Sequence, residues 1–150
     1  MAFTPCLLDT NILLRSANHA APEHTQVSKA IEYLLNEEPD LCYTAQNIVE
    51  FWNVSTRPRE KNGFGLGLSE ADREATLIET QFTLLPETPR IDEQWRDVLL
   101  SYGVFGVQVH DARLFAVMRA HGVQHLLTLN RADFARYSEV VLLHPGELAG

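Results

Sequence analysis

The stretch Cys6-Leu7-Leu8-Asp9 places a carboxylate directly after three apolar residues, the pattern of a short buried strand that ends at a polar residue. Further along, five apolar residues recur at the spacing of one helix face, until Pro39-Asp40 breaks the pattern before the apolar run Leu41-Cys42-Tyr43. These five residues are Val27, Ala30, Ile31, Leu34 and Leu35. The order strand, helix, strand indicates α/β units built around a parallel sheet.

The rest of the chain continues this alternation. We expect a helix over about 45–55 that ends before Pro58, then a mobile basic loop over 57–68, with Ser69 as the N-cap of the next helix. The later elements are expected as a helix over 70–81, a strand over 82–85, a helix over 91–102, a helix over 111–121 and strands over 125–129 and 140–143. Because the segment 111–121 is apolar on more than one face, we expect it to be a central, buried helix. Residues 1–150 are expected to form one domain.

The composition is that of a globular protein. Of the 150 residues, 45% are hydrophobic, and no apolar run approaches the roughly 18 residues needed to cross a bilayer. We therefore expect a soluble, cytoplasmic protein with no membrane partner. Cys6 and Cys42 lie in strand-like runs without a Cys-x-x-Cys spacing, which favours free thiols in a reducing compartment. The net charge of −8 opposes non-specific binding to a nucleic-acid backbone, although cations bound at an acidic site would weaken that repulsion.

Four carboxylates stand at the polar ends of apolar segments or inside them. They are Asp9, Glu50, Asp111 and Asp133. A buried charge is costly unless it is paired or ligates a metal, and Glu50 lies between Ile48-Val49 and Phe51-Trp52, where solvation is hard to arrange. In open parallel sheets, ligands gather beyond the carboxyl ends of the strands, where Asp9 and the turn 128–130 are expected. The sequence thus predicts an acidic, metal-binding pocket at that edge.

Clustered carboxylates suit the hydrolysis of phosphodiesters by divalent cations. Carboxylate oxygens are hard ligands that hold Mg²⁺ or Mn²⁺ and leave positions for water and phosphate. With two ions about 3.5–4 Å apart, one orients the attacking hydroxide and the other stabilises the leaving oxygen. Asp9 is the best candidate to bridge such ions. The six histidines are too scattered along the chain to indicate a zinc site.

Each acid taken alone also has an ordinary structural explanation. Asp111 fits the N-cap of its helix, Asn130 fits the cap of a short turn that contains Asp133, and Asp9 fits an Asx-turn. Capping does not explain why four acids occupy the positions that converge at one edge of a sheet. Other enzyme classes lack a required residue: a phosphatase of the Asp-x-Asp type needs an acid where Asn11 stands, and a dinucleotide fold needs a glycine-rich turn after Leu8.

Four segments together resemble the motifs of PIN-domain ribonucleases, and in particular of VapC toxins. They are Leu7-Leu8-Asp9-Thr10-Asn11-Ile12-Leu13, the mid-helix Glu50, His110-Asp111-Ala112, and Leu127-Thr128-Leu129-Asn130-Arg131-Ala132-Asp133-Phe134. The resemblance covers nearly the whole chain. It implies an α/β fold of the PIN type, an α/β/α sandwich with a central, mainly parallel sheet. It also implies Mg²⁺- or Mn²⁺-dependent endoribonuclease activity on an RNA substrate, a cognate VapB-like antitoxin as partner, and a homodimer.

The same resemblance assigns roles to individual residues. The acids expected to bind metal and carry catalysis are Asp9, Glu50, Asp111 and Asp133, with Asn130 as the alternative to the last. Side chains expected to orient these acids or a metal-bound water are Thr10, Asn11, Thr128 and Asn130. The basic residues that flank the motifs or lie in the loop are candidates for contacts with RNA phosphates: Arg15, Arg57, Arg59, Lys61 and Arg131.

Two other functions remain open on the sequence. One is a catalytically inactive PIN-like module that binds RNA or a protein, against which the acids at all four motif positions argue. The other is a PIN-type nuclease that works in RNA processing or on DNA, since two-metal hydrolysis does not itself require the 2′-hydroxyl.

Overall fold

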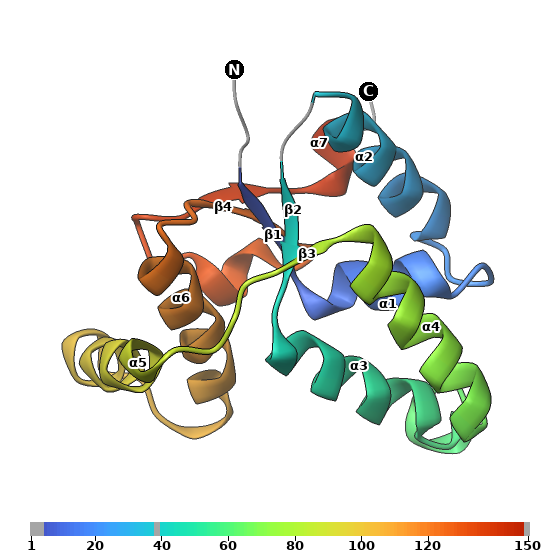
Figure 1. The fold of residues 1–150 in the computed structure, drawn as a ribbon, viewed down its shortest axis with the longest axis horizontal. Coiled ribbons are helices and arrows are strands. Elements are labelled where there is room, and N and C mark those ends of the chain that lie inside the picture. Colours follow the sequence, from blue (N-terminus) through green and yellow to red (C-terminus); the bar gives the residue numbers. More distant parts are fainter. Residues whose placement is uncertain (1–4, 38–39, 149–150) are drawn as a thin grey trace.

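The structure, a computed structural model, describes residues 5–37 and 40–148. Within them, parallel strands form one five-stranded sheet in the order β3-β2-β1-β4-β5 (Figure 1). The strands are β1 Cys6–Leu8, β2 Leu41–Tyr43, β3 Thr83–Leu84, β4 His125–Leu127 and β5 Val141–Leu143. The parallel sheet that the alternating pattern predicts is confirmed.

The middle strand is β1, which pairs with β2 on one side and β4 on the other. Cys6 lies opposite Leu41 of β2 and opposite His125 of β4. All three residues of β1 are buried, as expected of a parallel strand that helices cover on both faces. Asp9, the next residue, therefore leaves the sheet at the centre of its carboxyl edge.

Helices connect the strands and cover both faces of the sheet. The α-helices are α1 Thr10–Ala17, α2 His24–Asn36, α3 Ala45–Thr56, α4 Leu68–Gln81, α5 Pro89–Tyr102, α6 Val109–His121 and α7 Pro145–Leu148. Single 3₁₀ turns lie at Arg59–Lys61, Gly106–Gln108 and Arg131–Phe134. Among the described residues, every helix is too short or too polar to span a membrane.

The two faces of the sheet build two separate cores. Leu7 and Leu126 pack with side chains of α5 and α6, whereas Cys6 and Leu8 pack with side chains of α1, α2, α3 and α4. Neighbouring residues of a strand point to opposite faces, which explains this division. Figure 1 shows α5 and α6 on one side of the sheet and α1, α3 and α4 on the other. The α/β/α sandwich is confirmed.

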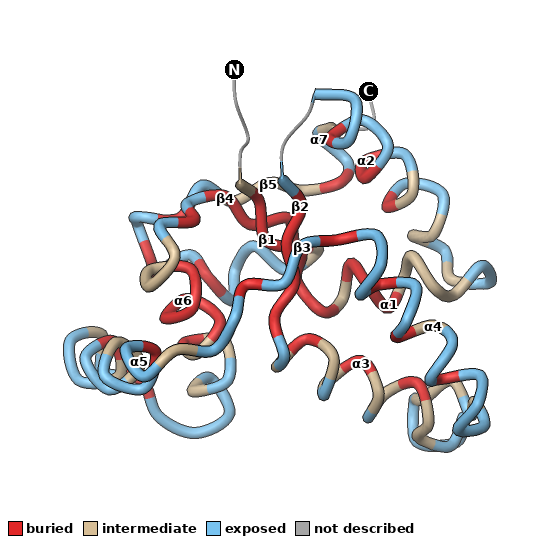
Figure 2. Tube along the Cα trace, in the orientation of Figure 1, coloured by how far each residue is buried: buried red, intermediate tan, exposed pale blue. Residues whose placement is uncertain are grey.

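The central helix expected over 111–121 is α6. Ala112 and the consecutive residues 114–118 are buried, and the helix packs along α5 (Figure 2). A helix covered on most of its surface needs apolar residues nearly all round, as this one has.

One residue of the predicted helix face is wrongly assigned. The buried stripe of α2 holds Val27, Ala30, Ile31 and Leu34, but Leu35 is 51% exposed. With about 100° between successive helical residues, Leu35 lies about 80° round from Val27, outside the arc that the other four occupy. The face of α2 that reaches the core is narrower than the spacing suggested.

The start of α4 also differs from the prediction. The helix begins at Leu68, with Gly67 as N-cap, so Ser69 lies inside the first turn. Glu70 Oε1 accepts a hydrogen bond from the Gly67 amide at 3.3 Å. A carboxylate at the third helical position thus satisfies a free amide of the helix end, and a serine cap is not needed.

The loop expected to be mobile over 57–68 ends at residue 67, where α4 begins, and the segment 57–67 is fixed by backbone hydrogen bonds. Gly63 donates to Pro58 at 3.0 Å, Gly65 to Arg57 at 2.9 Å, and Phe64 to Val54 at 3.0 Å. A Cβ at Gly63 would lie 2.0 Å from the Arg57 carbonyl oxygen, so the turn closes only around glycine. Gly63 therefore serves the close approach of two backbone segments.

Candidate active site

Polar residues follow three neighbouring strands at one edge of the sheet. Asp9 comes directly after β1, Thr44 after β2 and Thr128 after β4, and all three are buried. Because the strands are parallel, their carboxyl ends meet at this edge, the usual place for a ligand in an open α/β sheet. The motif residues are brought together by the topology of the fold.

Asp9 is 8% exposed and uses both carboxylate oxygens. Oδ1 accepts from the Thr10 amide at 2.8 Å and so caps α1. Oδ2 accepts from Thr128 Oγ1 at 2.7 Å and from Asn11 Nδ2 at 3.3 Å. Burial raises the pKa of Asp9 to about 6; these hydrogen bonds oppose the shift, and the charges of Glu50 and Asp133 add to it.

Asn11 and Thr128 join α1 to the turn that follows β4. Asn11 Oδ1 accepts from the Leu129 amide at 3.2 Å, and Asn11 Nδ2 donates to Thr128 Oγ1 at 3.4 Å. Thr128 Oγ1 also accepts from the Asn130 amide at 3.0 Å. The hydroxyl of Thr128 therefore donates to Asp9 while it accepts from the turn, and the Asp9 carboxylate is held in one orientation.

Glu50 extends from the middle of α3 toward Thr10. Thr10 Oγ1 donates to Glu50 Oε1 at 2.6 Å, and Asn47 Nδ2 donates to Thr10 Oγ1 at 2.9 Å. Gln46 Nε2 donates to the other oxygen, Glu50 Oε2, at 3.1 Å. Each carboxylate oxygen of Glu50 thus has its own donor.

Apolar neighbours do not keep Glu50 from solvent, contrary to what its place in the sequence predicts. Glu50 is only partly buried, and Val49 beside it is 69% exposed, while Phe51 is fully buried. Neighbours in a helix point in directions about 100° apart, so adjacent apolar residues do not surround the side chain between them.

Asp111 lies in the first turn of α6 and is partly buried. The helix begins at Val109, so the interpretation of Asp111 as its N-cap is wrong. The pKa of Asp111 is raised to about 7, first by burial and then by the charges of Asp9, Asp133 and Glu50. All four predicted acids therefore act on one electrostatic site, although they come from four separate segments.

Asp133 and Asn130 lie at the exposed rim. Asp133 belongs to the 3₁₀ turn Arg131–Phe134, and its amide donates to the Asn130 carbonyl at 3.1 Å. Asn130 is the N-cap residue of that turn, as one interpretation of the sequence has it, but its side chain makes no capping hydrogen bond there. Asp133 acts on the site through its charge, which raises the pKa of both Asp9 and Asp111.

Sequence reasoning missed three residues that support Glu50. Thr44 and Asn47 form the capping box at the start of α3, and Gln46 contacts Glu50 from one turn away. Two patterns could have found them: the Thr-x-x-Asn spacing before a helix, and the i, i+4 spacing of Gln46 and Glu50 on one helix face.

The oxygen donors of the site fit a hard divalent cation better than a soft one. Within residues 5–37 and 40–148, no three His, Cys, Asp or Glu side chains are placed closely enough to hold an ion, so the acids would have to move together on binding one. Asp9 and Asp111 have raised pKa values partly because neighbouring carboxylates repel them, and a cation among these acids would remove that repulsion.

Comparison with known proteins identifies the family. The family model described as PIN domain matches residues 6–140. The chain belongs to the PIN domain family. A search of curated proteins found no significant sequence match.

Solved structures with the fold of this PIN domain include toxin–antitoxin proteins. VapBC2 of Rickettsia felis, bound to a DNA fragment from its promoter, is 14% identical with a TM-score of 0.69, covering 94% of this chain and 98% of that one. FitAcB of Neisseria gonorrhoeae is 18% identical with a TM-score of 0.66, covering 95% and 99%. VapC20 of Mycobacterium tuberculosis, a toxin that cleaves the sarcin–ricin loop, is 20% identical with a TM-score of 0.59, covering 81% and 86%. At these identities the likeness shows the fold.

Several basic residues of the PIN domain are engaged within the chain. Arg15 pairs with Glu23 at 2.7 Å, and Arg131 pairs with Glu147. In the segment after α3, an Arg57 guanidinium nitrogen donates to the Asn62 carbonyl at 3.1 Å, and Arg59 Nε donates to the Phe64 carbonyl at 3.3 Å. Lys61 is exposed in the same segment. The segment that carries Arg57, Arg59 and Lys61 lies beyond the end of α3 that points away from the sheet (Figure 1).

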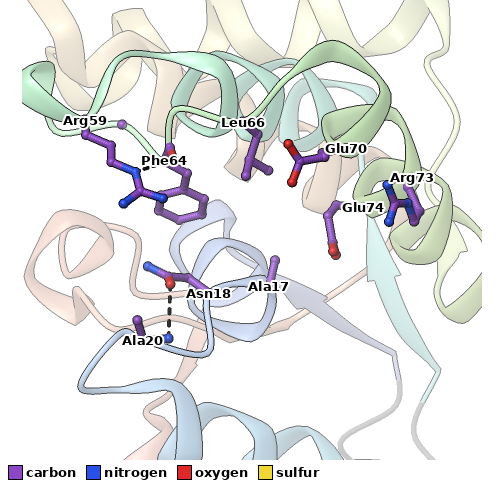
Figure 3. A pocket seen from close by; sticks show the side chains of 10 residues that line it. Ala17, Asn18, Ala20, Arg59, Phe64, Leu66, Glu70, Arg73 and Glu74 are labelled. Carbon is purple, nitrogen blue, oxygen red and sulfur yellow. Dashed lines mark hydrogen bonds between the residues drawn. The ribbon is translucent and has the colours of Figure 1, made fainter.

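The PIN domain also has a pocket of about 420 Å³ away from the acids. It lies between the end of α1, the segment 57–67 and α4 (Figure 3). Phe64 and Leu66 give it an apolar wall, and Arg59, Glu70 and Glu74 supply charges around it. A smaller pocket of about 200 Å³ between α1 and α4 shares Ala17 and Glu74 with it. These two adjoining pockets, which lie along α1 and α4, are together called the α1–α4 groove.

Proposed function

We propose that this PIN domain is a Mg²⁺- or Mn²⁺-dependent endoribonuclease that acts as the toxin of a VapBC-type toxin–antitoxin pair. The observation that carries the proposal is the electrostatic coupling of Asp9, Glu50, Asp111 and Asp133 at the carboxyl edge of the sheet. Four carboxylates gathered from distant segments repel one another, and a divalent cation is the partner that best offsets this cost.

In the proposed site, Asp9, Glu50 and Asp111 would hold the metal, with Asp133 at the rim. A bound Mg²⁺ or Mn²⁺ would lower the pKa of water and stabilise charge on the phosphate. The chain's own residues hold the acids ready: Thr128 and Asn11 fix the oxygen of Asp9 that does not cap the helix, and Thr10 fixes Glu50. Asp133 is favoured over Asn130 as the fourth metal ligand because its charge already acts on Asp9 and Asp111.

We also propose that basic side chains near the site contact the phosphates of the RNA. Arg15 and Arg131 are paired with carboxylates at the surface, and such exposed pairs are weak enough for a phosphate to displace them. The segment with Arg57, Arg59 and Lys61 would contact RNA only if the substrate extended along α3 beyond the acids. This arrangement suits a folded RNA better than a dinucleotide.

Two observations support an antitoxin as partner: the solved structures that share this fold, and the α1–α4 groove on the surface of the domain. A toxin–antitoxin complex from Klebsiella pneumoniae, 20% identical with a TM-score of 0.63, has the fold of this chain, as do VapBC2 and the toxin VapC20. The α1–α4 groove combines apolar walls with charges of both signs, as a peptide segment of a partner requires. We propose that the antitoxin occupies this groove and extends a basic side chain to the acids.

The decisive experiment is a cleavage assay on structured RNAs and single-stranded DNA with Mg²⁺, with Mn²⁺ and with EDTA. We expect metal-dependent cleavage of RNA, and a loss of about 100-fold or more in Asp9→Asn, which removes a metal ligand. Asparagine caps a helix as well as aspartate, so this variant should keep its fold. The matched control is Asp72→Asn, at an exposed position of α4.

Three outcomes would change the proposal. Cleavage by Asp9→Asn at the wild-type rate would rule out the metal role of Asp9. Cleavage of DNA in preference to RNA would assign the site to a DNA nuclease. The absence of cleavage together with binding of RNA would favour an inactive binding module.

A further inference from the structure

The side-chain amide of Gln46 connects two parts of the site. Gln46 lies in the first turn of α3, on the same face as Glu50 one turn later. Its Nε2 donates to Glu50 Oε2 at 3.1 Å and to the His110 carbonyl at 2.8 Å. His110 immediately precedes Asp111 in the first turn of α6. One amide group therefore contacts Glu50 directly and the helix turn that carries Asp111.

This contact spans the two layers of the fold. The side chains of α3 pack in the core on one face of the sheet, and those of α6 pack in the core on the other face. The carboxyl edge, where these layers approach each other, carries the acids. The bond from Gln46 to His110 is thus placed where it can fix the separation of Glu50 and Asp111.

The chemistry of the contact requires two donors. A side-chain amide nitrogen carries two N–H groups, and here each has an acceptor. The opposite orientation would place the amide oxygen against a carboxylate and a carbonyl, both of which are acceptors. The Gln46 oxygen is buried and finds no donor within the described part of the chain, so the side chain is held by its nitrogen alone.

We infer that Gln46 is a positioning residue, which sets Glu50 and Asp111 at the separation that lets both bind the same divalent cation. The inference rests on the proposed metal-dependent function. Gln46 does not itself bind the cation; it acts through the two elements that do. A residue of purely structural importance would affect folding without changing the affinity for metal.

The test is a calorimetric titration of the purified protein with Mn²⁺ in the absence of RNA. In Gln46→Met, which keeps the length of the side chain and removes both donors, we expect the dissociation constant for Mn²⁺ to rise about tenfold, as is typical when a residue that orients a metal ligand is lost. Gln26→Met, at an exposed position of α2, is the matched control and should bind Mn²⁺ as the wild type does.

Two further variants separate the possible explanations. In a Glu50→Gln background, Gln46→Met should weaken Mn²⁺ binding by a smaller factor, because part of its effect passes through Glu50. Gln46→Asn keeps the amide group but shortens the side chain by one methylene. If Gln46→Met does not fold, Gln46→Asn tests for the same loss of Mn²⁺ affinity. Melting in EDTA reports the folding of each variant separately.

The outcomes distinguish this inference from the proposed function. If the wild type does not bind Mn²⁺, or Asp9→Asn binds it equally well, the proposed metal site fails. If the wild type binds Mn²⁺ and folded Gln46→Met binds it with the same affinity, the positioning role of Gln46 is wrong while the metal site stands. A tenfold loss in Gln46→Met that Gln26→Met does not show would support the inference.

Discussion

Asp9 performs a structural and a chemical task with different oxygens. Oδ1 caps α1, and Oδ2 faces Thr128 and Asn11 at the carboxyl edge of the sheet. Asp9 can therefore cap a helix and also belong to the site. Keeping these carboxylates charged in the fold is unfavourable, because burial and the neighbouring carboxylates raise the pKa to about 6 for Asp9 and to about 7 for Asp111.

These pKa values predict how stability without metal depends on pH. Asp9 binds a proton more tightly in the folded chain than in the unfolded chain, where its pKa is near 3.8, so its contribution to stability is lost as the pH rises from about 4 through 6. The shift corresponds to about 3 kcal/mol. Relative to the wild type in EDTA, Asp9→Asn should therefore gain up to about that much unfolding free energy between pH 4 and pH 8.

Urea denaturation across this pH range measures the difference directly. The lowered pKa of His125 acts in the opposite direction, but it is common to both proteins and cancels in the comparison. Parallel stability curves for the wild type and Asp9→Asn would show that Asp9 has an ordinary pKa in the folded protein.

Among the elements, α3 shows what a sequence can and cannot predict. Its bounds, Ala45–Thr56, match the expected 45–55, because Pro58 limits the end of the helix and local patterns decide its length. The roles of Gln46 and Asn47 depend on α6 and α1, which approach α3 only in the folded chain. Local spacing predicts the cap formed by Asn47 and the contact of Gln46 with Glu50, but the contacts of these two residues with α1 and α6 could not be predicted without knowing these neighbours.

Asn47 links the start of α3 to the site, and its loss should destabilise the fold. Its side chain is fully buried; its oxygen accepts from the Thr44 amide at 2.8 Å, and its nitrogen donates to Thr10 at 2.9 Å. We expect Asn47→Ala to lower the free energy of unfolding by about 2–3 kcal/mol, because a cap and a buried hydrogen bond are lost together. Urea denaturation checks this value.

Asn53→Ala is the control for that measurement, since Asn53 is exposed on the same helix. It should change stability by less than about 0.5 kcal/mol. Equal effects of the two substitutions would mean that the contacts of Asn47 add nothing to an ordinary helix position.

At the scale of the whole molecule, the sequence predicts the class of the fold and the edge that carries the acids. The alternation of strands and helices indicates a parallel sheet, and strand ends mark its carboxyl edge. The order β3-β2-β1-β4-β5 could not be predicted from the residues, because strands of only two or three residues carry little information about their partners. The exposed position of Leu35 and the partial exposure of Glu50 likewise depend on tertiary packing.

Binding of metal should stabilise the molecule as a whole. A cation that binds only the folded state adds about 2.7 kcal/mol when its concentration is 100 times the dissociation constant. For a domain of this size, we expect Mg²⁺ at such an excess to raise Tm by roughly 5–10 °C relative to EDTA. Differential scanning calorimetry measures this shift.

Two controls accompany the Tm measurement. KCl at the same ionic strength should leave Tm nearly unchanged, and Asp9→Asn should lose most of the Mg²⁺ effect. An equal shift with KCl would mean that the salt acts by screening the net charge of −8 and that no specific site is filled.

The central place of β1 has a consequence for synthesis of the chain. β1 is synthesised before the other strands of the sheet but needs β4, and Asp9 needs Thr128, which lies 119 residues later. At typical translation speeds this separation takes roughly 6–24 seconds, during which the middle strand lacks its neighbour β4. Pairings so distant in sequence also slow folding. A nascent chain therefore carries an incomplete set of acids until its last third has been made.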